Sequence, residues 1–153
     1  MNKPKKPSKL IHKQAAPFKA TRKHHSTEAA EDYTELVAEL IIEKGVARTC
    51  DIARRLGISH VTALRTIKRL VEEGFLSTSP HQPVTLTLKG ARLAKESKDR
   101  HDTLIEFFTR LGVPSAIADI DVEGAEHHIS SVTLSKIKEF LVSNKSYSSC
   151  HKD

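Results

Sequence analysis

The sequence predicts a mainly α-helical fold, in which a winged helix-turn-helix unit is followed by further helices. Apolar residues recur at three- and four-residue steps over much of the chain, as in amphipathic helices. Two short helical segments flank a glycine-containing turn, and two alternating runs behind them flank a proline-bearing loop. The chain has 153 residues, enough for a hydrophobic core, and no apolar run reaches the ~18 residues of a membrane span.

The first predicted helix begins near Thr27, which is a suitable N-cap, and ends before Gly45. Its apolar positions, such as Tyr33 and Leu40, are spaced for one buried face. Residues 1–27 contain three prolines and neither a helical nor an alternating period. We therefore expect residues 1–27 to form a disordered basic tail.

The helix-turn-helix is predicted from two capped segments. Thr49 caps a short helix through Leu56, and Ser59 caps a longer one through Glu73, with Gly57 in the turn between them. Residues 75–78 and 84–88 alternate in polarity and flank a loop that contains two prolines. This hairpin completes a winged helix-turn-helix.

The second half of the chain is predicted to be helical. A long helix over residues 89–111 ends before Gly112, and Pro114 suits the first turn of a helix that runs to about His128. Ser130 or Ser131 caps a last helix through about Val142. Residues 144–153 are expected to be a flexible tail.

The net charge of +6 is unevenly distributed. Residues 1–27 and 44–100 are basic, which indicates a polyanionic partner such as nucleic acid, whereas residues 28–43 contain six acids and no base. The acidic segment indicates a cation. Two distant cysteines, outside any zinc-finger spacing, favour a reducing, cytoplasmic setting.

The second helix of a helix-turn-helix presents its N-terminal residues to base edges. Here Arg65 can bond guanine through two hydrogen bonds, Thr62 can bond a base or phosphate, and Val61 can contact a thymine methyl. Lys68 and Arg69, with Arg54 and Arg55, suit phosphates. A solvated basic face, or a winged helix that binds protein, is the alternative. The predicted DNA contacts are His60, Val61, Thr62, Arg65, Lys68 and Arg69.

Carboxylates and imidazoles are spaced to bind a metal ion. Glu123, Glu126 and His127 lie at i, i+3 and i+4, which places them on one face of a helix. Asp32 and Glu35 repeat this spacing, and His101 lies in the long helix. The oxygen-rich set without a thiol suits Mn(II) or Fe(II) and can also accept Zn(II), and carboxylates can bridge two ions. A solvated acidic face is the alternative, and His128 is expected to be structural.

Four segments resemble the manganese transport regulators of the diphtheria toxin repressor family of metal-dependent transcription factors. They are EDYTELVAELI at 31–41, LTLKG at 86–90, RH at 100–101 and DVEGAEHHIS at 121–130. The resemblance covers residues 28 to about 143. It implies a binuclear manganese site formed by Asp32, Glu35, His101, Glu123, Glu126 and His127. Iron-responsive relatives have Met and Cys where this chain has Asp32 and Glu126, so the resemblance favours manganese.

The resemblance implies a manganese-responsive repressor of manganese uptake genes that binds double-stranded operator DNA as a homodimer, with two Mn(II) ions per subunit. The expected organisation is a basic tail (1–27), a winged helix-turn-helix DNA-binding domain (28–97), a helical metal-binding and dimerisation domain (98–143) and a flexible tail (144–153). We expect no enzyme activity, no small-molecule substrate and no membrane partner. The alternatives are an iron or zinc sensor on the same scaffold and, from another class, a dinuclear metallohydrolase.

Overall fold

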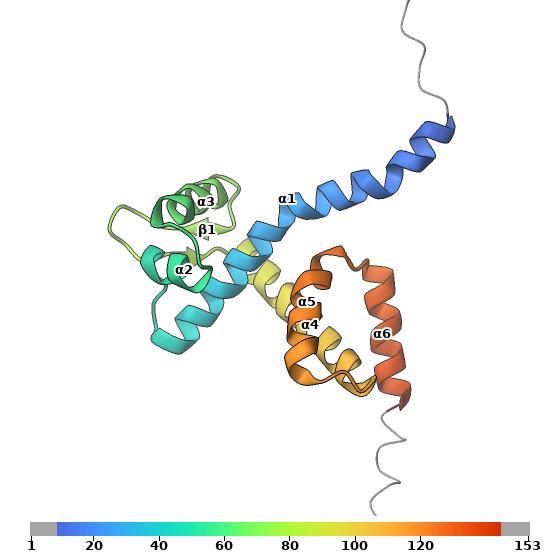
Figure 1. Ribbon diagram of the computed structural model, residues 1–153. Coiled ribbons are helices and arrows are strands. Elements are labelled where there is room, and N and C mark those ends of the chain that lie inside the picture. The colour runs from blue at the N-terminus through green and yellow to red at the C-terminus, as the bar shows by residue number, and fades with distance from the viewer. Residues whose placement is uncertain (1–8, 145–153) are drawn as a thin grey trace, which may run out of the picture.

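The computed structural model describes the backbone of residues 9–144, and side chains from residue 27 onward. Helices dominate this part of the chain, and the one small sheet in it is an antiparallel hairpin that pairs Leu76 with Leu86 (Figure 1). The elements in order are α1 (Lys9–Lys44), α2 (Thr49–Arg55), α3 (His60–Glu72), β1 (Leu76–Ser77), β2 (Thr85–Leu86), α4 (Leu88–Arg110), α5 (Ser115–Ala125), the 3-10 turn η1 (Glu126–His128) and α6 (Ser131–Ser143).

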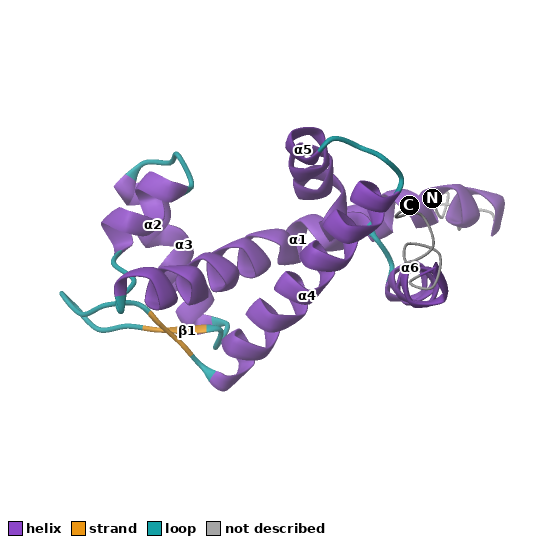
Figure 2. Cartoon of the chain, turned by 90° about the horizontal axis from the view of Figure 1, so that it is seen from below, coloured by secondary structure: helices purple, strands orange, loops and turns teal. Residues whose placement is uncertain are grey.

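Helices α1 and α4 lie side by side and connect the two halves of the molecule (Figures 1 and 2). At one end, α2, α3 and the hairpin pack against α1, and at the other end α5 and α6 pack against α4. The predicted winged helix-turn-helix followed by helices is confirmed. No helix in residues 9–144 is both long and apolar enough to cross a bilayer.

The main hydrophobic core fills the winged-helix half. One face of α1 meets α2, α3 and both strands there, which is the role that its three- and four-residue apolar spacing predicts. The fully or nearly fully buried members of this core are Ala30, Tyr33, Leu36, Val37, Leu40, Ala47, Ile52, Ile67, Leu70, Leu76 and Val84.

The local signals for α3 and for the wing act as predicted. The Ser59 hydroxyl accepts a hydrogen bond from the Thr62 amide at 3.1 Å and caps α3. Gly57 has a φ of 65°, which allows the turn between α2 and α3. At Gly90, a Cβ atom would lie 2.0 Å from the Phe75 carbonyl oxygen, so only glycine lets α4 approach the wing this closely.

Two helix boundaries at the N-terminal side differ from the prediction. Helix α1 begins at Lys9, not near Thr27, so the backbone of residues 9–27 is helical where we expected a disordered tail. Apart from Pro17, this stretch lacks helix breakers, and it contains four Lys and three Ala, whose helix propensity is high even without an amphipathic period. Residues 1–8 lie outside the described part. For α2, the N-cap is Arg48, without a side-chain cap, and Thr49 is the first helical residue.

The helix predicted from Pro114 to His128 is also different. Pro114 is the N-cap, α5 ends at Ala125, and residues 126–128 tighten into the 3-10 turn η1. Glu123 therefore belongs to α5, whereas Glu126 and His127 belong to η1, so the predicted single helical face is wrong in detail. The last helix starts as expected, with the Ser130 hydroxyl accepting from the Thr133 amide.

Candidate metal centre and recognition helix

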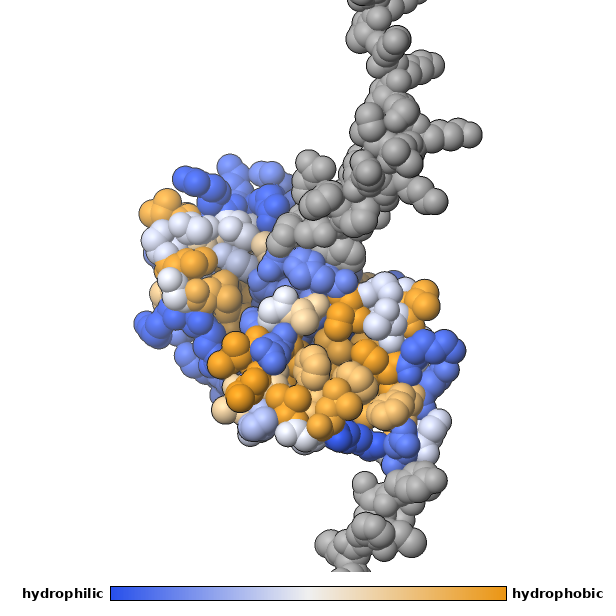
Figure 3. Space-filling model, turned by 45° about the vertical axis from the view of Figure 1, so that its right-hand side comes forward, coloured by the Kyte–Doolittle hydropathy of each residue, from blue (hydrophilic) through white to orange (hydrophobic). Residues whose placement is uncertain are grey.

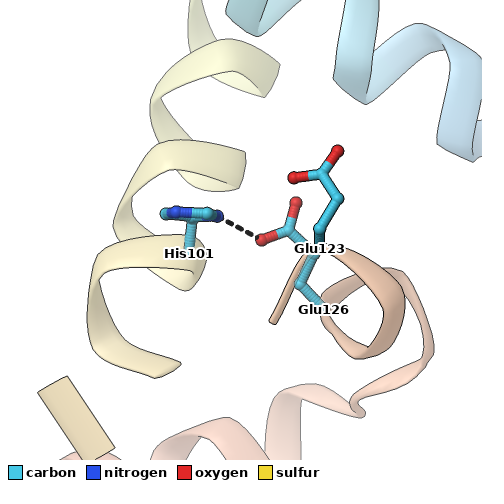
Figure 4. Close-up of side chains that lie close together, drawn as sticks. All are labelled: His101, Glu123 and Glu126. Atoms are coloured by element: carbon cyan, nitrogen blue, oxygen red, sulfur yellow. Dashed lines mark hydrogen bonds and ion pairs between the residues drawn. The ribbon is translucent and has the colours of Figure 1, made fainter. Parts of the chain in front are cut away.

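Three elements that are distant in sequence bring metal-binding groups together at the junction of the two halves. His101 comes from α4, Glu123 from α5 and Glu126 from η1, and one donor atom from each lies within 4.8 Å of the others (Figure 4). Glu123 is exposed, His101 is partly exposed and Glu126 is buried. The cluster therefore has an open side for a metal ion and a fixed, buried carboxylate behind it.

Helix α1 completes this arrangement. A hollow of about 310 Å³ lies between α1, α4 and α5, and both Asp32 and Glu35 line it. Oxygen and imidazole donors from all the expected segments thus face one space. The lining residues are Asp32, Glu35, Leu36, Glu39, Arg55, Leu56, Lys98, His101, Glu123 and Glu126.

The Glu126 carboxylate lies between the two histidines. Its Oε2 atom is 2.8 Å from His101 Nδ1, and its Oε1 atom is 3.6 Å from His127 Nε2. Only 3% of Glu126 is exposed, and this burial raises its pKa despite the opposing hydrogen bond with His101. A carboxylate with one oxygen toward each imidazole has the form needed to bridge two cations.

His127 is held by two acids of α1. Its Nδ1–H donates to Glu31 Oε2 at 2.6 Å, and its Nε2 lies 3.2 Å from Asp32 Oδ1. Hydrogen bonds to Asp32 and Glu31 outweigh burial and raise the pKa of His127 to about 10. The imidazole is therefore protonated at neutral pH when no metal is bound, and it must lose this proton to act as a ligand.

Glu31 and Arg100 are part of this network, although the sequence analysis did not identify them. Arg100 Nη2 donates to Glu31 Oε2 at 2.6 Å, on the same oxygen that His127 contacts. Burial opposes ionisation of Glu31, but His127 and Arg100 outweigh it and lower the pKa of Glu31. The only sequence signal is adjacency, since Glu31 precedes Asp32 and Arg100 precedes His101.

The donor set fits a hard or borderline divalent cation. Carboxylate oxygens and imidazole nitrogens converge without a thiol among the described residues, which suits Mn(II) or Fe(II) and also allows Zn(II). Two groups are visible: His101 with Glu123 and Glu126, and Asp32 with His127. Glu35 and Asp32 line the hollow together with the first group, whereas His127 does not line it and is connected to the first group through Glu126.

Two cations line the acidic hollow. Arg55 of α2 forms two hydrogen bonds to Glu43 and lies 3.6 Å from Glu39, both on α1. Lys98 of α4 pairs with Asp102 at 3.1 Å. Arg55, which we expected on phosphate, is therefore engaged within the protein and connects α2 to α1.

The predicted DNA contacts are all exposed on α3, the second helix of the helix-turn-helix, which we call the recognition helix. Arg65 and Lys68 have no ion pair among the described residues, whereas Arg69 Nε lies 3.8 Å from Glu73. The Thr62 hydroxyl already forms one hydrogen bond, because it lies 2.8 Å from the hydroxyl of Ser59, the N-cap of α3. Val61 is 66% exposed, so an apolar side chain is presented to solvent beside these basic side chains.

The other end of the molecule has exposed apolar residues. Ile120 of α5 is 73% exposed, and Val132 and Val142 of α6 are 71% and 68% exposed. Figure 3 shows apolar surface gathered on this side of the molecule. Several large apolar side chains exposed on the same half of a molecule are typical of a protein interface. We name this surface the apolar face; it consists of Leu111, Ile117, Ile120, Val132, Phe140 and Val142.

Solved structures similar to this chain share its fold. A manganese-dependent transcriptional repressor in complex with manganese has a TM-score of 0.66 and 28% identity, and the match covers 74% of this chain and 52% of that one. IdeR of T. acidophilum has a TM-score of 0.66 and 26% identity, with 73% and 53% covered. This chain spans about half the length of these solved proteins.

Sequence comparisons agree with the structural ones. The transcriptional regulator MntR of Salmonella typhimurium is 44% identical over 123 residues, which are 80% of this chain and 78% of that protein. The HTH-type transcriptional regulator MntR of Bacillus subtilis is 33% identical over 116 residues, with 76% and 82% covered. The N-terminal DNA-binding domain of the iron-dependent repressors matches residues 25–84, and their metal-binding and dimerisation domain matches residues 87–151. The chain therefore belongs to the iron-dependent repressor family.

Proposed function

We propose that the chain is a manganese-responsive transcriptional repressor, which binds operator DNA as a homodimer when Mn(II) is bound. The observation that supports this most directly is the cluster of carboxylates and imidazoles at the junction of the two halves, on the same chain as an exposed recognition helix. Of the relatives named above, two are transcriptional regulators called MntR and one is a manganese-dependent transcriptional repressor solved in complex with manganese.

We assign the metal ligands to Asp32, Glu35, His101, Glu123, Glu126 and His127. Four carboxylates and two imidazoles supply mostly hard donors, which is how a protein favours Mn(II), the weakest binder in the divalent series. Two ions per subunit are proposed because the two oxygens of Glu126 face different histidines. With ions bound, these residues would hold α1, α4, α5 and η1 together.

The position of the centre suggests how metal controls DNA binding. One face of α1 belongs to the core of the winged-helix half, and another face presents Asp32 and Glu35 to the metal centre. Glu123 and Glu126 belong to the other half. Ligation therefore restricts the movement of one half relative to the other and lowers the entropic cost of fitting two recognition helices to two half-sites.

On DNA, we assign base contacts to Val61, Thr62 and Arg65 near the start of α3, with His60 beside them. Lys68 and Arg69 contact phosphates, which position the protein without specifying sequence. The exposure of all six side chains supports this assignment. Arg55 is left out, because its guanidinium is paired with α1.

The second copy in the homodimer is proposed to dock on the apolar face. Leaving side chains such as Ile120 and Val132 in water is unfavourable, and burying them against the same surface of another copy removes this cost. We retain residues 28–97 and 98–143 as the proposed DNA-binding and dimerisation domains, although α4 crosses the boundary. The cytoplasm is the proposed location.

Binding of the chain to its own promoter region, titrated anaerobically with Mn(II), Fe(II) and Zn(II), tests the proposal. We expect sequence-specific DNA binding to appear when Mn(II) is added and to be lost when the metal is removed. Binding that responds to Fe(II) or Zn(II) but not to Mn(II) would identify a different sensor on the same scaffold. Binding that is independent of metal would refute the proposal.

A further inference from the structure

We propose that Glu31 and Arg100 position His127 in the metal centre. Glu31 holds the imidazole, and Arg100 holds Glu31. Neither residue is one of the six assigned ligands, and both belong to elements that also provide ligands. The inference rests on the proposed function, because it requires that His127 binds the metal.

The contacts of Glu31 determine which nitrogen of His127 is available. Glu31 Oε2 accepts the Nδ1–H of His127 at 2.6 Å. This leaves Nε2 directed toward Asp32 Oδ1, at 3.2 Å, and Glu126 Oε1, at 3.6 Å. A carboxylate that keeps the proton on one ring nitrogen fixes the tautomer and the ring orientation of a metal-binding histidine. Nε2 is therefore the donor atom.

Arg100 holds the Glu31 carboxylate in place. The side chains of Arg100 and Glu31 are only 17% and 12% exposed, and Arg100 Nη2 donates to the Glu31 oxygen that His127 contacts. A carboxylate this buried requires a partner, because desolvation without one is costly. Since Arg100 and His101 are adjacent on α4, the same turn of helix supports both histidines of the centre, His101 near Glu126 and His127 through Glu31.

Two other roles for Glu31 lead to different results. As a direct ligand, Glu31 would contribute to metal affinity whether or not His127 is present. As a purely structural residue, it would change the stability of the metal-free fold and leave the Mn(II) affinity of the folded chain unchanged. A positioning residue lowers Mn(II) affinity only while the residue that it positions is present.

The test is a double-mutant cycle with Mn(II) itself as the probe, in which the EPR signal of free Mn(II) reports binding. We expect Glu31→Ala to weaken Mn(II) binding by about 10- to 100-fold in the wild-type background, as for other outer partners of metal-binding histidines. In the His127→Ala background, the same substitution should have almost no further effect. Arg100→Gln should give a smaller loss, which is also absent without His127.

Matched variants separate these effects from misfolding. Asp51→Ala removes a paired carboxylate from α2 that does not line the hollow, and should leave Mn(II) binding unchanged. Glu31→Gln retains an acceptor oxygen for His127 and should lose less affinity than Glu31→Ala. If urea unfolding shows that the Glu31→Ala variant does not fold, Glu31→Gln is used in the double-mutant cycle instead.

Equal losses in both backgrounds would make Glu31 a ligand and overturn the proposal, as would no loss in either. The proposed function fails by a different result, in which the unmodified chain does not bind Mn(II) or binds DNA without it. The two failures are therefore distinguishable.

Discussion

The two halves of the molecule obtain their stability differently. Among residues 27–144, whose side chains the structure describes, 14 of the buried apolar side chains belong to residues 30–94, and only Leu104, Ala118, Val122 and Leu141 lie beyond them. The second half instead buries Glu126 and His127 and exposes the apolar face. The winged-helix half thus has its own core, whereas the other half depends on groups that a metal ion and a second copy would satisfy. The half that contains α5 and α6 therefore has the smaller apolar core of its own.

The core of the winged-helix half provides the largest expected effect. Leu40→Ala removes a side chain that is 1% exposed in the centre of that core, and should lower the free energy of unfolding by about 2–5 kcal/mol. Urea unfolding of the metal-free chain measures it. The control is Ile42→Ala on the same helix, 84% exposed, which should change stability by no more than about 0.5 kcal/mol. Equal effects would show that this core does not carry the stability.

A substitution on the apolar face should weaken dimer association and leave the folding of the subunit unchanged. Ile120→Asp places a charge on this face and should raise the dimer Kd by about 10- to 100-fold, because an interface residue is replaced by one that resists desolvation. Analytical ultracentrifugation measures the Kd, and urea unfolding checks that each subunit remains folded. An unchanged Kd would place the dimer interface elsewhere.

The recognition helix should show base-specific and nonspecific effects at neighbouring positions. Arg65→Ala should weaken operator binding by about 1–3 kcal/mol and relax the preference at one base position. Lys68→Ala should weaken all sequences alike. Binding to a set of operators with single substitutions distinguishes the two. If Arg65→Ala lowered specific and nonspecific binding equally, Arg65 would be a phosphate contact.

The smallest effect concerns protons at the metal centre. Because the pKa of His127 is raised to about 10, Mn(II) binding at Nε2 displaces a proton, and affinity should rise with pH by up to tenfold per unit from this residue. In the metal-free chain, the same shift stabilises the fold fully below pH 6.5, and this contribution is lost as pH rises through about 10. Calorimetry in buffers of different ionisation enthalpy counts the protons. The His127→Ala variant should release one proton fewer on binding Mn(II). An unchanged number of released protons would remove His127 from the ligands.

The winged-helix half was predictable because its signals are local. Ser59 caps α3, Gly57 forms the turn, and the apolar spacing of α1 marks the face that is buried. The start of α1 was mispredicted because helix propensity, without amphipathicity, extends it to Lys9. Tertiary packing at η1 overrides the helical spacing of Glu126 and His127.

Of the candidate metal centre, the sequence predicts only the residues whose type and spacing are typical of metal ligands. Asp32, Glu35 and His101 could be selected as donors from sequence, and the structure places them around one hollow. Glu31 and Arg100 could not be selected, because their role depends on a contact between residues 69 positions apart. Nor does local sequence indicate that Arg55 pairs with Glu43 instead of being free to contact phosphate.

Glu126 is proposed to join the two parts of one manganese centre, and no other assigned ligand has this central role. The direct measurement is operator binding against buffered free Mn(II), with metal analysis, for the wild-type chain and Glu126→Cys. A thiolate replaces a hard carboxylate, so the variant should need more Mn(II), respond to a softer ion such as Zn(II) or Co(II), and bind fewer ions per subunit. An unaltered Mn(II) response, with the wild-type number of ions still bound, would remove Glu126 from the centre and contradict the account.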